Sequence, residues 1–294
     1  MAYSQVPAHF ARLIEVGEAR INVVDVGDEG GTPVVFLHGG GPGCTGWNDW
    51  HAVGESLGEK HRRIYVDFPY YGGSSATRVH GPMFSAMADI VAGVAEALGL
   101  KRFHLVCQSF GGGGAIVLAT RRPEMVMSLA LTGVGVEYGV GAPYMAERVL
   151  KHFLFPMYAP RPTRDQMKTL LEVTEWYDPQ LISDDLVDAR FELAGSDQAI
   201  ERFTDFGVLG DPEALAPYLP MNTVPTLLAY GDADPFVAAD VPVHLFNAFP
   251  NSRLVMVKHA SHHFPEEMPE TYLSVIRPWF DECESRLAVG AENS

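Results

Sequence analysis

Ser109 stands where a short apolar run gives way to four glycines, in the segment Phe103-His-Leu-Val-Cys-Gln-Ser-Phe-Gly-Gly-Gly-Gly-Ala. This order predicts a strand that turns sharply into a helix, with the serine exposed on the strained turn. The amides and dipole of the helix N-terminus would favour an oxyanion beside that serine. Cys107 stands where such turns most often have glycine. Ser109 is therefore a candidate nucleophile, and the alternative is a structural turn with an incidental serine.

A serine nucleophile needs a base, and the base needs an orienting carboxylate. Asp234 and His262 follow two later apolar runs, in the segments Tyr-Gly-Asp-Ala-Asp-Pro-Phe-Val and His-Ala-Ser-His-His-Phe. The order serine, acid, histidine agrees with a strand-turn-helix nucleophile. Asp232 is a competing acid, but it would emerge too close to its strand. His259 and His263 compete as bases, and the histidine cluster lacks the partner spacing of a zinc site.

A second glycine run, His38-Gly-Gly-Gly-Pro-Gly, follows another apolar run. Such a loop turns backbone N–H groups toward a reacting carbonyl oxygen. We expect the N–H groups of Gly40 and Phe110, the residue after the serine, to form the oxyanion hole. A phosphate loop is excluded by the missing Gly-Lys-Ser/Thr ending, and a dinucleotide loop by the glycine spacing.

Composition restricts the class of protein. The 294 residues include 21 Lys and Arg against 37 Asp and Glu, a net charge of −16, which argues against a nucleic-acid partner. The hydrophobic fraction of 47% is that of a globular chain with a sizeable core. Three widely spaced cysteines form no disulfide framework or metal motif. No apolar stretch predicts a signal peptide or membrane span, so we expect a cytoplasmic protein without a membrane partner.

The elements that must position these residues follow a βα rhythm. Runs rich in β-branched and apolar residues predict eight strands, and the rhythm predicts a mostly parallel sheet in an α/β fold with helices on both faces. The expected strands are Arg12–Val16, Ile21–Val26, Val34–Leu37, Arg63–Asp67, Phe103–Cys107, Leu129–Thr132, Thr226–Tyr230 and Arg253–Val257. Helices are expected after Ser109 and over Trp50–Leu57, Met83–Leu98, Val241–Phe249 and Tyr272–Arg286.

The rhythm stops after the sixth strand. Residues 139–219 have no clear strand pattern, are rich in aromatic residues and Met, and break at prolines around Phe155–Pro162. We expect a helical cap over residues 139–219, inserted into a core of residues 1–138 and 220–294. The substrate pocket would lie between this cap and the carboxyl edge of the sheet. Only Ala288–Ser294 is expected to form a frayed tail.

These segments together resemble the α/β-hydrolase fold, as does Asp67-Phe-Pro-Tyr-Tyr-Gly-Gly-Ser. More narrowly they are similar to the meta-cleavage product hydrolases, serine-triad enzymes that hydrolyse a carbon–carbon bond in ring-opened aromatic compounds. The resemblance covers nearly the whole chain. Its most specific part is the cap segment Trp176-Tyr-Asp-Pro-Gln-Leu-Ile-Ser-Asp-Asp-Leu-Val-Asp-Ala-Arg-Phe-Glu, because the triad motifs are shared by esterases, epoxide hydrolases and peptidases.

Arg190 lies in that cap segment, on the apolar stripe of a helix that Ser183 caps. A guanidinium on a buried face needs a partner. A substrate carboxylate would serve, and the resemblance implies this role because the family binds its dienoate carboxylate with the matching arginine. An internal ion pair with an Asp or Glu of the cap is the alternative.

Three departures from the family pattern fall on its polar substrate site: Asp49 and Gln108 where the family has asparagine, and His263 where it has tryptophan. Tyr70 also replaces a glycine. We place Asp49, Gln108 and His263 at the substrate site. An unpaired carboxylate at Asp49 would repel an anionic substrate, which leaves open a substrate other than the biphenyl-derived dienoates.

The resemblance implies a cofactor-free hydrolase that acts on a 2-hydroxy-6-oxo-dienoate-type product of aromatic ring cleavage. We place the glycines Gly39 and Gly41 at the same site, and we expect a homodimer or higher homo-oligomer without a metal. Two alternatives stay open, which are an esterase or lactonase with the same triad and a non-catalytic small-molecule receptor.

Overall fold

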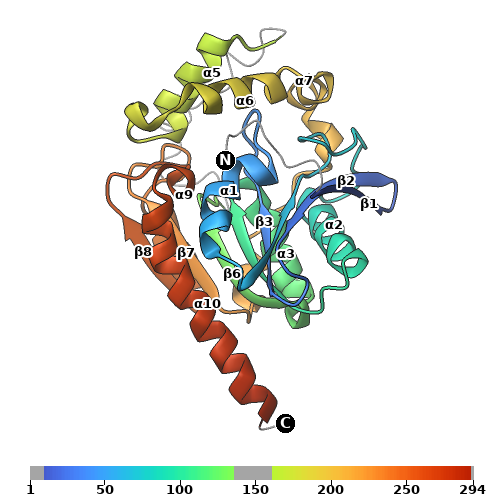
Figure 1. The fold of residues 1–294 in the computed structure, drawn as a ribbon, viewed down its shortest axis with the longest axis vertical. Coiled ribbons are helices and arrows are strands. Elements are labelled where there is room, and N and C mark those ends of the chain that lie inside the picture. The colour runs from blue at the N-terminus through green and yellow to red at the C-terminus, as the bar shows by residue number, and fades with distance from the viewer. Residues whose placement is uncertain (1–9, 136–160, 293–294) are drawn as a thin grey trace.

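A computed structural model describes residues 10–135 and 161–292 of the chain (Figure 1). Its centre is an eight-stranded sheet in the order β1-β2-β4-β3-β5-β6-β7-β8. Only the β1–β2 and β2–β4 pairings are antiparallel, so the expected mostly parallel sheet is confirmed. The strands are β1 (Ala11–Val16), β2 (Ala19–Val26), β3 (Thr32–Leu37), β4 (His61–Val66), β5 (Phe103–Gln108), β6 (Val126–Thr132), β7 (Thr226–Gly231) and β8 (Ser252–Val257).

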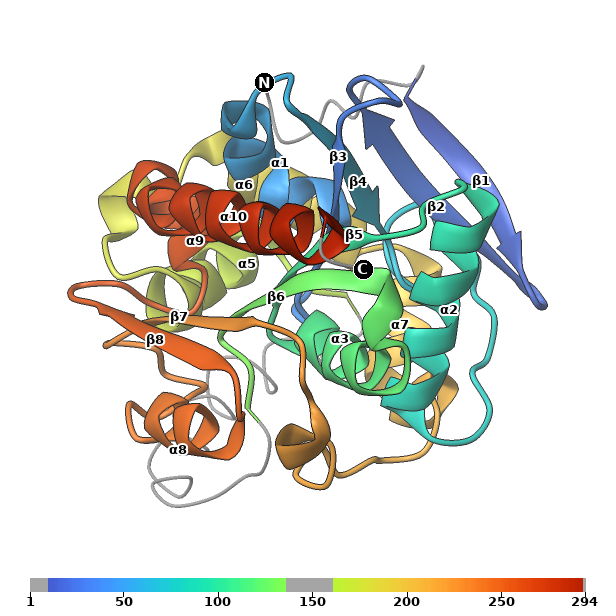
Figure 2. The same cartoon turned by 90° about the horizontal axis from the view of Figure 1, so that it is seen from below.

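Helices cover both faces of the sheet (Figure 2). One apolar core joins the sheet to α2 (Met83–Ala97), α3 (Phe110–Arg121) and α8 (Val241–Ala248). A second core on the opposite face joins it to α1 (Gly46–Leu57), α9 (Phe264–Glu267) and α10 (Pro269–Glu292). The central strands are buried on both faces, which explains their nearly continuous apolar sequences.

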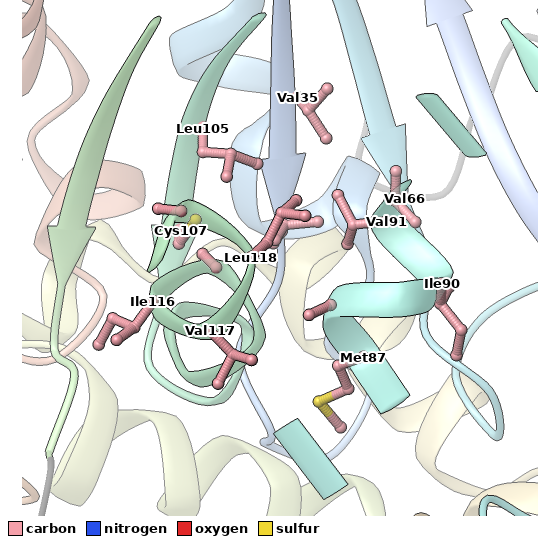
Figure 3. Close-up of a cluster of buried hydrophobic side chains, with 14 of the residues drawn as sticks. Val35, Val66, Met87, Ile90, Val91, Leu105, Cys107, Ile116, Val117 and Leu118 are labelled. Atoms are coloured by element: carbon pink, nitrogen blue, oxygen red, sulfur yellow. The ribbon is translucent and has the colours of Figure 1, made fainter. Parts of the chain in front are cut away.

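Figure 3 shows part of the first core, where side chains of β3, β4 and β5 meet those of α2 and α3. Cys107 points into this core, so its side chain is accommodated by packing although glycine is commoner there. A Cβ on Gly111 would lie 2.7 Å from the carbonyl oxygen of His38, and one on Gly113 would collide with the Phe84 ring. The glycine run therefore brings α3 close to the loop after β3 and to α2.

Two expected helices differ from those observed. Helix α1 begins at Gly46 rather than Trp50, because Thr45 accepts a hydrogen bond from the Asn48 N–H and caps it four residues earlier. Helix α10 extends the predicted Tyr272–Arg286 at both ends. It reaches Glu292, so the frayed tail expected from Ala288 was wrong over its first residues. Ala, Leu and Glu in that last stretch favour helix.

Residues 161–219, the described part of the segment that is expected to form the cap, are mainly helical. They contain α5 (Arg164–Leu170), the π turn η3 (Leu171–Glu175), α6 (Asp184–Ala194), α7 (Asp197–Thr204) and the 3₁₀ turns η4 (Pro179–Leu181), η5 (Phe206–Leu209) and η6 (Leu219–Met221), and they have an apolar cluster of their own. Figure 1 shows α5, α6 and α7 grouped at one end of the molecule. Most of the predicted break at Phe155–Pro162 lies outside the described residues. Within those residues, no helix has the length and apolar character that a bilayer span requires.

Candidate active site

Parallel pairing brings the ends of five strands to one edge of the sheet. Leu37 of β3 pairs with Cys107 of β5, Gln108 pairs with Thr132 of β6, and β7 and β8 pair up to their last residues. The glycine loop that starts at His38 follows β3, and Ser109, Asp234 and His262 likewise follow strands that end at this edge. The topology therefore gathers the candidate residues from four distant segments of the sequence.

Ser109 has the backbone strain expected of a nucleophile on a sharp turn. Its φ and ψ are 45° and −112°, in a region that few non-glycine residues adopt. Its N–H donates to the Thr132 carbonyl at 2.8 Å, and its carbonyl accepts from the Gly112 N–H at 2.9 Å. These bonds from β6 and α3 hold the turn, and the serine stays partly exposed.

His262 and Asp234 are bonded to each other. The His262 Nδ1 lies 2.8 Å from the Asp234 Oδ2, and both residues are buried. The other Asp234 oxygen accepts hydrogen bonds from the N–H groups of Phe236 and Val237 at 2.8 and 3.1 Å. Gln108 donates from Nε2 to the His262 carbonyl at 2.7 Å. His262 is thus held both at its ring and at its backbone carbonyl.

Burial alone would lower the pKa of His262, but the charge and hydrogen bond of Asp234 raise it above its ordinary value. The His262 ring also packs closely against the backbone at Gly133. A Cβ on Gly133, whose φ is +63°, would lie 2.7 Å from the His262 Cε1. Glycine at 133 is needed both for its backbone conformation and for the space that His262 occupies.

The competing residues are engaged elsewhere. Asp232 accepts from the Lys258 Nζ at 3.0 Å and from the His259 N–H at 2.8 Å. His259 is exposed, and its Nδ1 lies 2.9 Å from the hydroxyl of Tyr177 in the cap. The structure therefore brings Asp234, not Asp232, to His262.

The glycine loop that starts at His38 packs directly against the nucleophile turn, because a Cβ on Gly40 would lie 3.1 Å from the Phe110 Cβ. His38 holds the peptide between Gly39 and Gly40. Its Nε2 accepts the Phe68 N–H at 3.0 Å, which leaves the proton on Nδ1, and Nδ1 donates to the Gly39 carbonyl at 2.7 Å. Burial lowers the pKa of His38 to about 4, so the ring is neutral near pH 7.

The neighbouring peptides of this loop are held as well. Asp49 accepts the Gly39 N–H at 2.8 Å. The Gly40 carbonyl accepts from the Tyr71 hydroxyl at 3.2 Å and from the Arg202 Nη1 at 3.1 Å. These bonds tie up the groups on either side of the Gly40 N–H, which is the group expected to bind an oxyanion.

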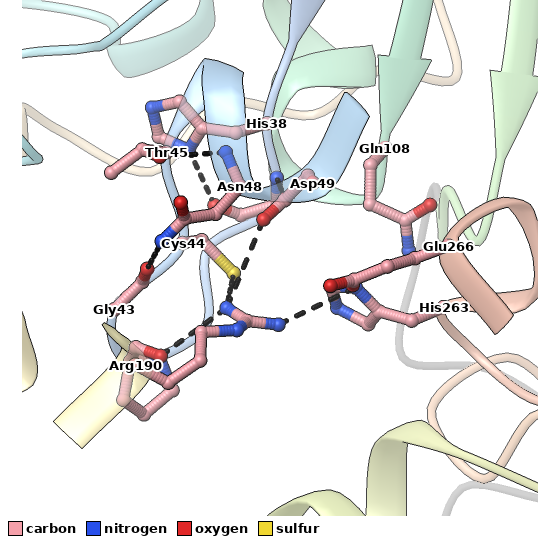
Figure 4. Close-up of polar contacts among 12 residues, drawn as sticks. His38, Gly43, Cys44, Thr45, Asn48, Asp49, Gln108, Arg190, His263 and Glu266 are labelled. Atoms are coloured by element: carbon pink, nitrogen blue, oxygen red, sulfur yellow. Dashed lines mark hydrogen bonds and ion pairs between the residues drawn. The ribbon is translucent and has the colours of Figure 1, made fainter. Parts of the chain in front are cut away.

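Arg190 is wholly buried at the cap boundary, and Figure 4 shows its guanidinium among polar groups of the core. Its Nη2 donates to the Glu175 Oε2 at 2.7 Å, and its Nη1 lies 3.8 Å from the Asp49 Oδ1. Nη1 also contacts the Pro42 carbonyl and the Cys44 thiol. The ion pair with a cap Glu, which the sequence left open, is therefore present.

His263 extends this network. Its ring nitrogens lie 3.1 Å from the Glu266 Oε2 and 3.4 Å from the Glu175 Oε2. Burial lowers the pKa of His263 to about 4, so the ring adds no charge near pH 7. Burial also raises the pKa of Asp49, whose Oδ1 has no hydrogen-bond partner among the described residues. Three carboxyl groups therefore surround the single guanidinium of Arg190.

Sequence reasoning missed the residues that complete the site, which are Glu175, Glu266, His38, Tyr71 and Arg202. The sequence indicated Glu175 only indirectly. A buried arginine needs an acidic partner, but the sequence does not show which acidic residue that is. His38 was quoted as the start of the glycine run, without a role. Gly39 and Gly41 lie beside the polar network, since Cβ atoms on them would approach Asp49 and Glu175 respectively.

Among residues 10–135 and 161–292, no group of three or more His, Cys, Asp or Glu side chains has an arrangement that could hold a metal ion. All three cysteine thiols are free and buried.

The family model described as the α/β hydrolase fold matches residues 32–269. A 2-hydroxy-6-oxononadienedioate/2-hydroxy-6-oxononatrienedioate hydrolase of Burkholderia vietnamiensis is 31% identical over 86% of this chain and 88% of its own. A 2-hydroxy-6-oxo-6-phenylhexa-2,4-dienoate hydrolase of Burkholderia cepacia is 30% identical over 83% of this chain and 85% of its own. The chain therefore belongs to the α/β-hydrolase fold family and, within it, to the meta-cleavage product hydrolases.

Solved structures agree on the fold. The meta-cleavage product hydrolase CumD of Pseudomonas fluorescens matches with a TM-score of 0.79 at 23% identity, over 94% of this chain and 99% of its own. An esterase of Thermogutta terrifontis matches with a TM-score of 0.71 at 22% identity, over 93% and 98%. The fold class and the resemblance expected from the sequence are both confirmed. The protein is an enzyme of the hydrolase class.

Proposed function

We propose that this enzyme hydrolyses a carbon–carbon bond in a 2-hydroxy-6-oxo-dienoate-type product of aromatic ring cleavage. Ser109 is the nucleophile, His262 its base, and Asp234 the carboxylate that orients the base. The observation that carries the proposal is the strained Ser109 turn at the same sheet edge as the 2.8 Å bond between His262 and Asp234. The relatives named above supply the substrate class.

The hydrogen bond to Asp234 leaves the other nitrogen of His262, Nε2, free to take the serine proton. After ketonisation of the dienol, the Ser109 oxygen bonds to the remote ketone carbon and its proton passes to His262. The oxyanion that results is bound by the N–H groups of Gly40 and Phe110. His38 supports this step, because its bond to the Gly39 carbonyl polarises the peptide that carries the Gly40 N–H.

Collapse of the tetrahedral intermediate breaks the bond between the former ketone carbon and the rest of the chain. The carbon leaving group takes the proton from His262, and the acyl group stays on Ser109. Water then gives a proton to His262 and attacks the acyl carbon, which releases a carboxylic acid and restores the serine. No oxidant, reductant or metal is needed for these steps.

The test is a panel of ring-cleavage dienoates and p-nitrophenyl esters, assayed with the wild type and with Ser109→Ala. The proposal expects dienoate turnover that yields a carboxylic acid and a shortened dienoate, and loss of turnover in the variant. Turnover of esters alone would replace the proposal with the second candidate below.

An esterase is the second candidate, and the Glu175–Arg190 pair favours it. Because Glu175 and Asp49 already surround Arg190, a substrate carboxylate would compete with them for the guanidinium. A neutral ester would meet no such competition. A substrate carboxylate at Arg190, which the resemblance implies, would therefore have to displace Glu175 or Asp49 from the guanidinium.

Several wider expectations stay predictions. These are a role in aromatic-compound degradation, a cytoplasmic location, a homo-oligomeric state, and the division into a core and a 139–219 cap with the substrate between them. Size-exclusion chromatography with light scattering tests the oligomeric state.

A further inference from the structure

The loop that carries His262 is contacted on both sides by residues 175–178, which belong to the segment expected to form the cap. Before His262, the His259 Nδ1 lies 2.9 Å from the Tyr177 hydroxyl. After it, the His263 N–H donates to the carbonyl of Glu175 at 3.0 Å. These contacts therefore bracket the catalytic base.

Glu267 makes a third contact with the same segment. Its carboxylate is buried, and Oε1 accepts the Asp178 N–H at 2.7 Å. Both carboxylate oxygens also lie 3.1 Å from the backbone N of Tyr177. Hydrogen bonds from N–H groups to a carboxylate are shorter and stronger than those between neutral groups. Glu267 is therefore a firm link between this segment and the core.

The short helix α9 connects Glu267 to the neighbour of His262. Glu267 is the last residue of α9, and the N–H groups of Glu266 and Glu267 both donate to the His263 carbonyl at 2.9 Å. A displacement of Glu267 would therefore be passed to His263 and from there to His262.

The loop also needs support before His262, because His259 is strained. Its φ is +57°, in the left-handed region that few non-glycine residues adopt. Such a conformation persists only where the surrounding contacts hold it. Asp232 accepts the His259 N–H at 2.8 Å, and the Tyr177 hydroxyl contacts the ring. Tyr177 thus supports the strained residue three positions before His262.

Residues 175–178 are themselves held in place. Trp176 is buried in the apolar cluster that α5 and α6 share, and its N–H donates to the Leu171 carbonyl at 3.0 Å. Glu175 is paired with Arg190. The segment can therefore serve as a rigid support for the loop.

We propose that residues 175–178 position the catalytic base, acting through Glu267 and His259 as positioning residues. Gln108 and Asp234 bond to His262 itself, whereas these contacts fix the loop that carries it. The proposal rests on the role of His262 in the proposed function and gives residues outside the triad a part in the chemistry.

Glu267→Gln is the direct test, assayed on the substrate of the panel above that the wild type turns over fastest. Glutamine keeps the size of the side chain, but its amide NH₂ replaces one carboxylate oxygen and cannot accept a backbone N–H. We expect kcat to fall about 10- to 100-fold through misplacement of His262, with a much smaller change in KM.

The pH profile shows whether the loss acts through His262. Asp234 raises the pKa of His262, so a histidine displaced from Asp234 should titrate at lower pH. The acid limb of kcat/KM should therefore move to lower pH in Glu267→Gln. Either a wild-type kcat or an acid limb that stays in place would overturn the proposal.

Glu213→Gln is the matched control. Glu213 also accepts a backbone N–H, that of Ser85 at 2.7 Å, in the first turn of α2. Both glutamine variants should melt at a lower temperature than the wild type, but only Glu267→Gln should change kcat and the acid limb. Equal changes in the two variants would indicate a general loss of structure and would count against positioning.

If Glu267→Gln does not fold, Tyr177→Phe decides. The Tyr177 side chain is 46% exposed, so the variant removes only the hydroxyl beside His259. It should lower kcat about 2- to 10-fold, as for one hydrogen bond, and move the acid limb in the same direction. Tyr218→Phe is its control, since it loses a hydroxyl bond to Glu213. Equal kcat values in the two phenylalanine variants would overturn the proposal.

Failure of this proposal is distinguishable from failure of the proposed function. If the wild type cleaves esters but no dienoate, the carbon–carbon hydrolase proposal fails, while the ester assay still tests the positioning of His262. If dienoates are cleaved and Glu267→Gln keeps the wild-type kcat, the function stands and the positioning role fails.

Discussion

Glu175 and Arg190 form a buried ion pair, Oε2 to Nη2, at 2.7 Å, with both side chains at most 1% exposed. Glu175 ends the π turn before the segment that carries the family resemblance, and Arg190 lies 15 residues further on. The pair joins the end of the π turn to α6, and Arg190 also contacts the Pro42 carbonyl in the glycine loop after β3.

Glu175→Gln should therefore lower the stability of the protein. Removing one partner of a buried pair costs about 3–5 kcal/mol where the other charge is left uncompensated, but Asp49 and Glu266 remain near Arg190, so the loss should be smaller, about 2 kcal/mol. Equilibrium urea unfolding measures the change. Arg164→Gln breaks an exposed pair and should cost about 1 kcal/mol or less. A Glu175→Gln loss no larger than that of the control would show that the buried pair does not stabilise the cap.

The neutral state of His38 should make stability depend on pH. Its folded-state pKa of about 4 is below the ordinary 6.5, so the unfolded chain binds this proton more readily. The contribution of His38 is therefore complete above about pH 6.5 and declines as the pH falls toward 4. His263 has the same direction of shift.

Unfolding free energies of the wild type and His38→Asn, measured from pH 4 to 7.5, isolate this contribution. Within this window, the unfolding free energy should rise with pH more steeply for the wild type than for the variant. The difference should correspond to about one additional proton bound by the unfolded chain. Parallel slopes would mean that His38 is not held neutral by burial.

Asp234 should control the acid limb of activity. Because Asp234 raises the pKa of His262 above 6.5, kcat/KM should begin to fall, with decreasing pH, above pH 6.5. Asp234→Asn removes the charge, so the limb should move to lower pH while kcat drops. The pH profile of kcat and kcat/KM with a neutral ester measures both effects. If the acid limb does not move in Asp234→Asn, the group that titrates there is not His262.

Gly133 should matter for catalysis beyond its backbone conformation. Gly133→Ala places a Cβ 2.7 Å from the His262 Cε1 and should lower kcat by about 100-fold through misplacement of the base. Gly17→Ala is the matched control, since Gly17 also has positive φ but open space around it. Both variants should lose about 1–2 kcal/mol of stability. Similar kcat values in the two variants would contradict this role.

The features predicted well from sequence are those set by neighbouring residues. All eight strands lie where runs of apolar residues predict them, and the turn at Ser109 follows from the order of a strand, a serine and a glycine run. Helix α1 was misplaced at its start because its apolar pattern begins at Trp50, whereas its first turn depends on the single capping residue Thr45.

The polar network could not be predicted in this way. Glu266 and His263 are three residues apart, but the contact of His263 with Glu175 depends on how residues 161–219 pack on the core. Arg202 lies in the segment Ser-Asp-Gln-Ala-Ile-Glu-Arg-Phe, which looks like an ordinary exposed helix. Its burial comes from contact with Tyr71, 131 residues away, and nothing local indicates that contact.

The central claim is that Ser109 attacks a dienoate ketone and cleaves a carbon–carbon bond. The most direct measurement is the turnover of a 2-hydroxy-6-oxo-dienoate by the wild type, Ser109→Ala, His262→Ala and the double variant, with the products identified by mass spectrometry. Each single variant should lose several orders of magnitude in kcat, and the double variant little more, because the residues act as a unit. Retention by Ser109→Ala of more than about a tenth of wild-type kcat would contradict the covalent mechanism.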